Sequence, residues 1–311
     1  MTTADYNGFQ RAFFIVCWIE FIVAILLLCA RCYTALRIVH RIAADFYLAL
    51  GTFILGAGSM SMLTVGAAHG LGVSMALLSH KERELALMYG WINQFIALFA
   101  IGLGKLAIVS FLSRIQGYQT RLRAIVLWTL AASNLLVNII AAILLIVQCS
   151  PVTRLWDAQI PGQCPGRKRI QIFGFVQGPY SAFVDFALAL YPILIFSRVQ
   201  VFSIATKIGL CVLMGCGLAA GACAIVKTVK LTLLTRLEDP THTLADVILW
   251  NETEMWVVFI VSCIPPTKGF FALVIRKGCN GVSSFFRQLR SHGAHKSQDE
   301  SLRELSAQPD A

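Results

Sequence analysis

The stretch AFFIVCWIEFIVAILLLCARCYTAL, residues 12–36, decides the fold because nearly every side chain in it is apolar. A helix that rises about 1.5 Å per residue needs roughly 20 apolar residues to cross a bilayer core. Six further runs of similar character follow, at residues 44–68, 85–113, 124–148, 172–197, 207–235 and 247–275. The sequence therefore predicts an all-α membrane protein, a seven-transmembrane helix bundle.

The overall composition supports a membrane protein. The 311 residues are 57% hydrophobic and 14% charged, and their mean hydropathy is +0.72. Soluble domains are usually about 45–50% apolar and about 25% charged. The formal net charge of +10 is spread over the ends of the apolar runs rather than gathered on one basic face. We therefore expect the lipid bilayer, and not nucleic acid, as the main partner.

Lys and Arg predict the orientation of the chain. The connections after the first, third and fifth runs are enriched in basic residues: Arg37, Arg41, Arg114, Arg121, Arg123, Arg198 and Lys207. Basic loops stay in the cytosol, so we expect residues 1–11 outside as a short N-terminus and residues 276–311 as a cytosolic tail. Within that tail, residues 279–292 interleave Phe and Leu with Arg, which predicts a short amphipathic helix on the inner leaflet.

Two of the ten cysteines differ from the others. Most lie within apolar runs, where a thiol behaves as a small hydrophobic group. Cys149 and Cys164 instead bracket the polar segment 150–163, which we place outside, where oxidation is permitted. A disulfide and a pair of free thiols both fit this placement, and we predict the disulfide. No cysteine pair has the spacing of metal ligands, so no metal site is expected.

Lys105 and Asp185 lie deep in the third and fifth runs. An ionisable side chain costs about 2.5–3.5 kcal/mol at the centre of an inserted helix, so such groups face the interior or pair. The two residues could share a depth and form an interhelical ion pair. Such a pair is either purely structural or the polar floor of a ligand cavity or ion path.

A second set of polar side chains is expected toward the outer side of the bundle: Glu20, His69, Lys227, Lys230 and Glu254, with Trp250 one turn before Glu254. Together they could hold a polar ligand at one mouth, or each could contact lipid head groups separately. On the inner side, we expect Asp45 to lie at the interface, close to Arg41.

Known catalytic motifs are missing from the sequence. It contains no phosphate-binding glycine loop with Lys-Ser/Thr, no His-Glu-x-x-His and no Gly-x-Ser-x-Gly. We therefore predict no catalytic residues. A membrane-embedded enzyme remains a third alternative, which needs a convergent acid–base pair that the sequence does not place. A retinal-binding opsin needs a lysine deep in its last span, whereas Lys268 follows Pro265-Pro266 at the inner end. Neither retinal nor another cofactor is expected.

Several segments in order resemble the fungal rhodopsin-domain family of integral membrane proteins. The most specific is Cys149-x-Pro151-x-x-x-x-Trp156-Asp157 followed by Gly162-x-Cys164. Supporting positions are Arg41 with Asp45, Gly66 with His69, Lys105-Leu106 with Arg114, Asp185 with Pro192, Lys207-Ile208-Gly209, and Trp250 with Glu254 and Pro265. The resemblance covers residues 13–275. It implies that the chain is related to a satratoxin-cluster membrane protein and, more widely, to seven-helix fungal receptors of the appressorium type. Where the family often has paired acids, Phe46 follows Asp45.

These features predict a receptor-like protein of the plasma membrane or an endomembrane that senses a small molecule. Ligand-biased helix rearrangement would use Lys105 and Asp185 as interior switch residues, and would act on a cytosolic signalling partner that the sequence does not identify. The alternative is a transporter or accessory membrane protein of a secondary-metabolite pathway, of the mycotoxin type, that handles an apolar product.

Overall fold

The computed structural model describes residues 3–40, 42–116, 121–196, 215–229 and 240–267. The chain divides into two compact units, Met1–Thr267 and Lys268–Ala311. The first unit contains every described residue, so the predicted tail 276–311, with its amphipathic segment 279–292, lies outside the described part of the chain.

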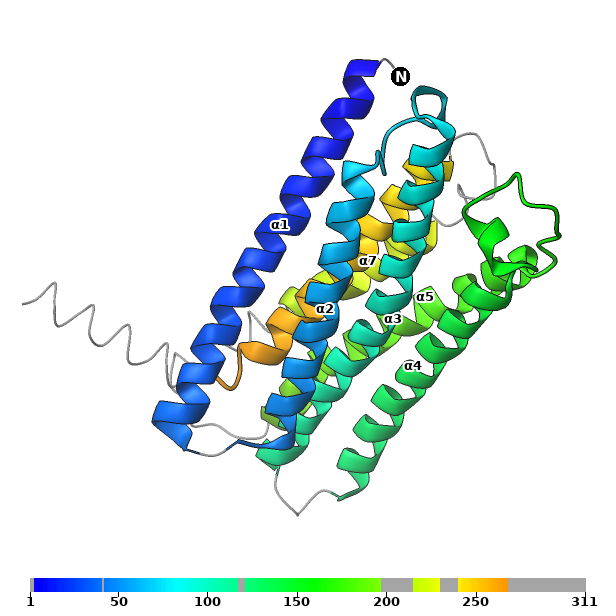
Figure 1. Ribbon diagram of the computed structural model, residues 1–311. Coiled ribbons are helices and arrows are strands. Elements are labelled where there is room, and N and C mark those ends of the chain that lie inside the picture. The colour runs from blue at the N-terminus through cyan, green and yellow to red at the C-terminus, as the bar shows by residue number, and fades with distance from the viewer. Residues whose placement is uncertain (1–2, 41, 117–120, 197–214, 230–239, 268–311) are drawn as a thin grey trace, which may run out of the picture. The chain divides into compact units, whose positions relative to one another are not determined.

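The first unit is a bundle of long helices, whose backbone groups are paired within each segment (Figure 1). The helices are α1 (Thr3–Tyr33, continued by the π-helical turn Thr34–Val39), α2 (Ala44–Ala68), α3 (His80–Gln116), α4 (Arg121–Val147), α5 (Arg167–Phe196), the unlabelled helix Gly215–Val229, and α7 (Pro240–Cys263). Short 3₁₀ helices, Met75–Leu77 and Val152–Leu155, lie in the loops. Within the described ranges, the β-structure consists of one isolated antiparallel bridge between Ser150 and Gln163. The all-helical class predicted from the sequence is confirmed.

Five segments are long and apolar enough to cross a membrane: Arg11–Val39, Ala44–Ala68, His80–Arg114, Leu122–Val147 and Arg167–Tyr191. The predicted sixth crossing is described over Gly215–Val229, which is apolar but shorter. The predicted seventh crossing is the helix α7, which is not one of the five. Its acidic residues Asp246, Glu252 and Glu254 explain this, because they fall within every window long enough to span. Five of the seven predicted crossings are therefore supported.

α3 is the central helix of the described bundle. It packs against α2, α4 and α7, and over fewer residues against α5. In its most apolar window 61% of the residues are buried, against 17% in that of α1. α1 packs mainly against α7 and α2, and exposes large apolar side chains such as Ile15, Ile19 and Leu26. Polar groups that meet on α3 are thus shielded from the lipid that would surround α1.

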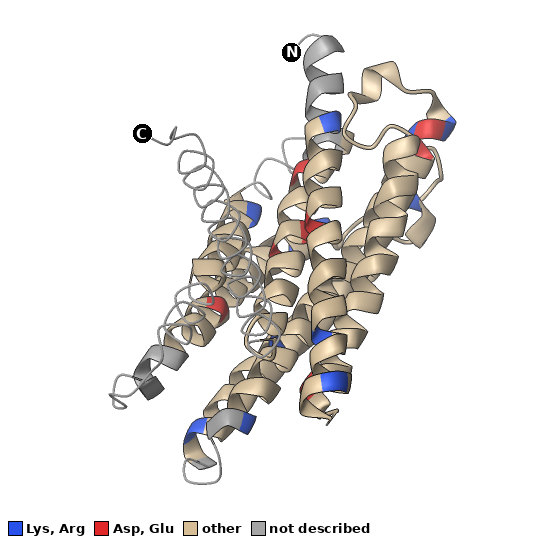
Figure 2. Ribbon diagram, turned by 90° about the vertical axis from the view of Figure 1, so that its left-hand side faces the viewer, with Lys and Arg blue, Asp and Glu red and all other residues tan. Residues whose placement is uncertain are grey.

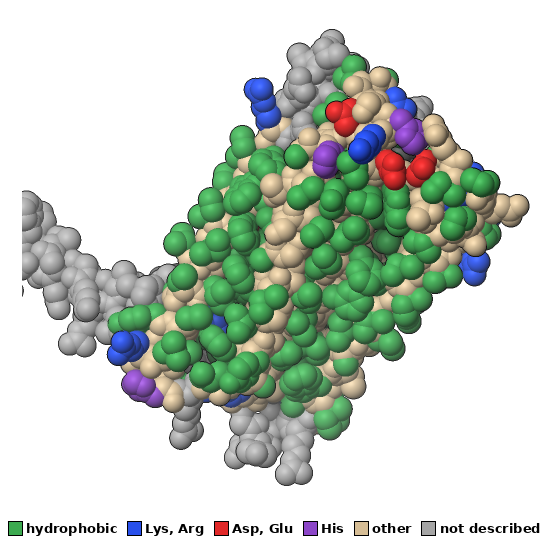
Figure 3. Space-filling model, in the orientation of Figure 1, with side chains coloured by type: hydrophobic (Ala, Val, Ile, Leu, Met, Phe, Trp, Pro, Cys, Tyr) green, Lys and Arg blue, Asp and Glu red, His purple; other side chains and the backbone are tan. Residues whose placement is uncertain are grey.

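The surface of the bundle is apolar between two polar ends. The face drawn in Figure 3 is largely covered by hydrophobic side chains, while charged and His side chains gather at its two ends. Along the helices, most of the described Lys and Arg also lie toward the ends, whereas some acidic residues lie partway along (Figure 2). An apolar belt flanked by charge is the pattern expected of helices that cross a bilayer.

Aromatic side chains pack α1, α2 and α7 together. The Trp256 ring lies 5.4 Å from Phe21 and 6.1 Å from Phe259, measured between ring centroids, and Phe53 contacts all three. A Cβ added at Gly56 would lie 2.8 Å from the Trp256 ring. The glycine therefore permits the close approach of α2 to α7, as small residues do between membrane helices.

Candidate functional site

A disulfide-closed loop covers one end of the bundle, which we call the loop end. Cys149 and Cys164 form the predicted disulfide, which joins the residues after α4 to those before α5. The backbones of Ser150 and Gln163 exchange two hydrogen bonds of 2.9 and 3.1 Å within the loop. His80 Nε2 lies 3.4 Å from Asp157 Oδ1, which connects the loop to the start of α3. The disulfide prediction is confirmed, and the loop is fixed to two helices.

A cavity of about 930 Å³ lies beneath this loop. Its walls come from the loop, α3, α4, α5, α7 and the helix Gly215–Val229, and they are mainly apolar: Leu87, Trp91, Leu98, Leu145, Trp156 and Val247. Ligand cavities typically measure about 300–1,000 Å³ and combine apolar walls with a few polar groups. The cavity therefore has the size and lining of a small-molecule site.

Four polar residues that the helices contribute to the lining are Gln94, Gln177, Lys227 and Thr228, which we call the floor. Gln177 donates a 2.9 Å hydrogen bond to Asn138, so its orientation is fixed. The Oε1 atom of Gln94 is buried and has no hydrogen-bond partner among the described residues. A buried acceptor left unpaired is costly, which makes Gln94 a group that a ligand donor would stabilise.

Lys227 connects the floor to a set of buried charges. Its Nζ lies 2.6 Å from Glu254 Oε2, and it donates a 3.0 Å hydrogen bond to Asn251. Behind it, Lys105 Nζ lies 3.0 Å from Asp185 Oδ1 and 3.8 Å from Glu254 Oε1. We call Lys105, Asp185, Lys227 and Glu254 the interior charge cluster. It joins α3, α5, α7 and the helix Gly215–Val229.

The interior charge cluster balances two positive and two negative side chains. All four side chains are at most 6% exposed, so each charge depends on its partners for stabilisation. Ser181 supplements the pairs, because it accepts a 2.7 Å hydrogen bond from Lys105 and donates another of 2.7 Å to Glu254. Asp185 Oδ2 has no partner within the described ranges. The cluster is therefore neutral but incompletely paired, and a change at Lys227 alters the pairing of the rest.

The structure brings four of the predicted site residues into one group, whereas the sequence had suggested two separate groups. Lys227 and Glu254 were expected at an outer mouth, apart from Lys105 and Asp185. That expectation was wrong, because α7 begins at Pro240 and not at residue 247. Glu254 therefore lies about 21 Å along the helix, at the depth of Lys105.

The other predicted residues lie elsewhere. His69 stacks on Tyr89 with ring centroids 6.1 Å apart, at the loop-end terminus of α2. Glu20 projects from α1, and its Oε2 atom is buried without a partner in the described part of the chain. Trp250 is partly buried on α7 and does not line the cavity. Lys230 lies outside the described residues.

A second buried polar group was not predicted. Glu252 Oε1 accepts hydrogen bonds of 2.5 Å from Ser59 and 2.8 Å from Asn93. These residues join α7 to α2 and α3, and all three are 0% exposed. The sequence signal that could have identified this group is the presence of these polar residues within otherwise apolar runs. Asn251 is also fully buried, so the glycosylation sequon that begins there is inaccessible in this structure.

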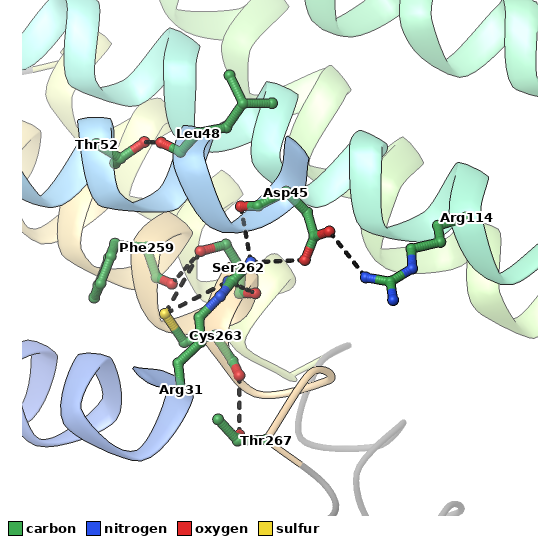
Figure 4. Close-up of polar contacts among 9 residues, drawn as sticks. All are labelled: Arg31, Asp45, Leu48, Thr52, Arg114, Phe259, Ser262, Cys263 and Thr267. Atoms are coloured by element: carbon green, nitrogen blue, oxygen red, sulfur yellow. Dashed lines mark hydrogen bonds and ion pairs between the residues drawn. The ribbon is translucent and has the colours of Figure 1, made fainter. Parts of the chain in front are cut away.

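At the opposite end of the bundle, a network of ion pairs joins four helices (Figure 4). Arg31 NH2 lies 2.9 Å from Asp45 Oδ2, and Arg31 NH1 donates a 2.5 Å hydrogen bond to the Ser262 carbonyl. Asp45 Oδ1 lies 3.3 Å from Arg114. We call Arg31, Asp45, Arg114 and Ser262 the opposite-end network. Asp45 lies in the first turn of α2, is 4% exposed and pairs with Arg31, whereas Arg41 lies outside the described residues. The expected position of Asp45 at the membrane interface stays a prediction.

No group of three or more His, Cys, Asp or Glu side chains able to hold a metal ion occurs in the part of the chain that the structure describes. The polar groups available for chemistry at the cavity are thus amides, hydroxyls, Lys and Arg, with Glu84 and His80 at the edge. This set can bind and orient a polar molecule.

Comparison with known proteins relates the sequence to fungal membrane proteins. Residues 30–273 match the fungal rhodopsin domain. Wortmanamides biosynthesis cluster protein C of Talaromyces wortmannii is 24% identical over 188 residues, which cover 60% of this chain and 47% of that protein. Fugralins biosynthesis cluster protein 2 of Gibberella zeae is 26% identical over 129 residues, 41% of this chain and 31% of that protein. The matched regions thus span less than half of either relative.

Proposed function

This chain belongs to the fungal rhodopsin domain family of membrane proteins, and on that basis we propose that it binds a small molecule in the cavity beneath the disulfide loop. The proposed outcome is receptor-like: occupancy of the cavity biases the packing of the helices. The receptor assignment belongs to this proposal, and the family membership alone does not carry it.

The observation that carries the proposal is the position of Lys227. This one side chain lines the cavity and pairs with Glu254 of the interior charge cluster. A ligand that attracts Lys227 weakens its pair with Glu254. Glu254 then draws Lys105 closer, at the expense of the pair between Lys105 and Asp185. Because these residues lie on four different helices, binding is coupled to helix packing.

The proposed membrane arrangement has seven crossings, with the N-terminus outside and the C-terminus in the cytosol. The disulfide loop and the cavity mouth then face the exterior or an organelle lumen, where disulfides persist. The cytosolic side carries the opposite-end network and would face a signalling partner. Both the plasma membrane and an endomembrane fit this arrangement.

Ligand-dependent thermal stabilisation tests the proposal. The chain in phosphatidylcholine nanodiscs is heated with and without fractions of a fungal culture extract, and an active fraction is expected to raise the Tm. A ligand present at 100 times its Kd adds about 2.7 kcal/mol to the free energy of unfolding. Ala141 lines the cavity, so Ala141→Trp should abolish the shift by filling space. Leu136→Trp is the matched control, because Leu136 lies on the same helix and is 57% exposed. Equal shifts in both variants would contradict binding in this cavity.

A second candidate function is favoured by the relatives. Both have names that assign them to biosynthesis clusters. The corresponding proposal is that this protein is a transporter or accessory membrane protein of a secondary-metabolite pathway, and that the cavity holds a pathway product. Metabolite profiling of a deletion strain separates the two functions. If the deletion strain no longer makes a metabolite, or keeps it inside the cells instead of exporting it, the transporter or accessory role is favoured. If its metabolite profile is unchanged but it no longer responds to the added ligand, the receptor is favoured.

A further inference from the structure

We propose that the cavity takes an amphipathic organic anion, with its acidic group at the loop end and a polar group at the floor. This inference rests on the proposed function and specifies the ligand class of the same site.

The loop end of the cavity is strongly cationic. Among the described residues of its lining, five are Lys or Arg and one, Glu84, is acidic. Lys227 lies at the floor, and the remaining four come from three different segments near the loop: Arg83, Arg154, Arg167 and Lys168. We call these four residues the cationic rim. Charges of one sign that line a cleft with apolar walls attract ligands of the opposite sign.

The start of α5 makes this charge excess notable. Arg167 and Lys168 occupy the first turn of α5, and no acidic residue accompanies them there. The N-terminus of a helix carries a partial positive charge, so cations in the first turn are unfavourable by about 0.3–1 kcal/mol each. An anion seated between them offsets this repulsion. A helix selected for stability alone would carry Asp or Glu in these positions.

Two floor residues, Lys227 and Gln94, have hydrogen-bonding capacity left for a ligand. A lysine ammonium has three N–H donors, and the described partners of Lys227 are Glu254 and Asn251, which use two of them. The third is available to a ligand in the cavity. Gln94 Oε1, which is buried and unpaired within the described ranges, supplies the acceptor. A hydroxyl or carboxamide satisfies both, whereas a purely apolar end leaves both unsatisfied.

The intervening walls set the middle of the ligand. Trp91, which lies between Arg83 and Gln94 along α3, and Leu98 and Leu145 are apolar parts of the lining and offer no charge. An apolar body of a few hundred Å³ fits the volume of about 930 Å³. An amine of the same shape would meet the cationic rim, and Glu84 is its one counter-charge among the described lining residues. Charge and burial together therefore favour an acid over an amine.

Binding of a fluorescent acid and its ester tests the charge. The full chain in phosphatidylcholine nanodiscs is titrated with dansylaminoundecanoic acid and with its methyl ester, and empty nanodiscs correct for partition into lipid. We expect the acid to bind about tenfold more tightly than the ester, since two or more partly exposed charge pairs contribute. The double change Arg167→Gln with Lys168→Gln should remove that advantage and leave the affinity for the ester unchanged.

A control variant distinguishes a contact inside the cavity from the general charge of the protein surface. Arg169 lies in the same turn of α5 and is exposed, but does not line the cavity, so Arg169→Gln should change the affinity for the acid by less than about twofold. An equal loss in Arg169→Gln would overturn the inference, because it would point to the general field of the surface. If the acid and the ester bind equally well, and Ala141→Trp abolishes the binding of both, then the anionic ligand class is overturned but the cavity remains a binding site. Failure of both probes to bind contradicts the proposed function as well.

The same chemistry occurs in free acids and in anionic lipids. Adding phosphatidylserine to the nanodiscs distinguishes these sources of the anion. Competition with the dansyl acid identifies a membrane lipid as an occupant of the cationic rim. Unchanged binding indicates a free acid. Both results retain the anionic ligand class.

Discussion

The interior charge cluster and the opposite-end network use the same chemistry in different surroundings. Each joins four helices around pairs of Lys or Arg with Asp or Glu; in the opposite-end network, α7 is joined by the hydrogen bond from Arg31 to the Ser262 carbonyl. At the opposite end, Arg31 lies against the backbone and side chain of Asp45 and the carbonyl of Ser262. In the interior charge cluster, Asp185 Oδ2 is unpaired among described residues and Lys227 borders a cavity. A fully paired network fixes helices, whereas a partly paired one beside a cavity can be rearranged by a ligand.

Breaking the opposite-end network should have the largest effect. Arg31→Met leaves the buried Asp45 with Arg114 as its cationic partner, and Arg114 is half-exposed. We expect the free energy of unfolding to fall by about 4 kcal/mol, as when one partner of a buried pair is removed. Chemical denaturation in detergent micelles measures the loss. Arg31→Met with Asp45→Leu should recover part of the stability, and no recovery would show that the pairing is unimportant.

Opening the disulfide loop should have the next largest effect, confined to the loop end. Cys149→Ser with Cys164→Ser removes a cross-link between residues 15 positions apart. The expected loss is about 3 kcal/mol in the chain-entropy treatment. Hydrogen exchange should increase in residues 150–163 and at the start of α5, with the opposite-end network unchanged. Faster exchange at Arg31 and Asp45 would contradict the independence of the two regions.

Removing Lys105 should cost less than removing Arg31. In Lys105→Met, Glu254 keeps Lys227 and Ser181, so the main unpaired charge is Asp185. We expect a loss of about 2 kcal/mol, less than for Arg31→Met, because Glu254 keeps its other partners and Asp185 is the group that loses its cation. Lys105→Met with Asp185→Leu should restore stability and keep the rise in Tm that reports binding, but abolish the ligand-dependent change in hydrogen exchange of α3 and α5. A change in exchange that survives in the double variant would disprove the switch role of the pair.

Lys227→Gln should have the smallest effect on stability and a distinct effect on binding. Glu254 retains Lys105 and Ser181, so we expect a loss of about 1 kcal/mol in the free energy of unfolding. The affinity for dansylaminoundecanoic acid should fall about fivefold, since the floor loses a charged donor. Thr241→Val, near Val73 and outside the cavity lining, is a control expected to keep the affinity. Equal affinities for Lys227→Gln and the unmodified chain would remove Lys227 from the floor.

The sequence was sufficient for properties that depend on composition along the chain. Long apolar runs predicted the helices, and Cys149 and Cys164 on either side of a polar segment predicted the disulfide. Lys105 and Asp185 were recognisable because a charge within an apolar run must be accommodated.

Properties that depend on helix rotation and register were not predictable in the same way. α7 begins with the polar residues from Pro240 to Asp246, so its apolar run seemed to start late and Glu254 was placed too shallow. Arg31 lies within the predicted run 12–36 and was not among the predicted site residues. Its partner Asp45 follows 14 positions later, across a turn whose path the sequence does not specify. Gln94 could not be distinguished from other buried amides until the cavity was known.

The acidic residues of α7 have a consequence for the order in which this protein is assembled. Each acid would cost about 2.5–3.5 kcal/mol at the centre of a helix inserted into lipid alone. Glu252 instead meets Ser59 and Asn93, and Glu254 meets Lys227 and Ser181. All four partners precede α7 in the chain, so a ribosome delivers them to the membrane first. The polar partners of Glu252 and Glu254 are therefore in the membrane before α7 is made, so we expect α7 to be integrated by its neighbouring helices instead of by its own hydrophobicity.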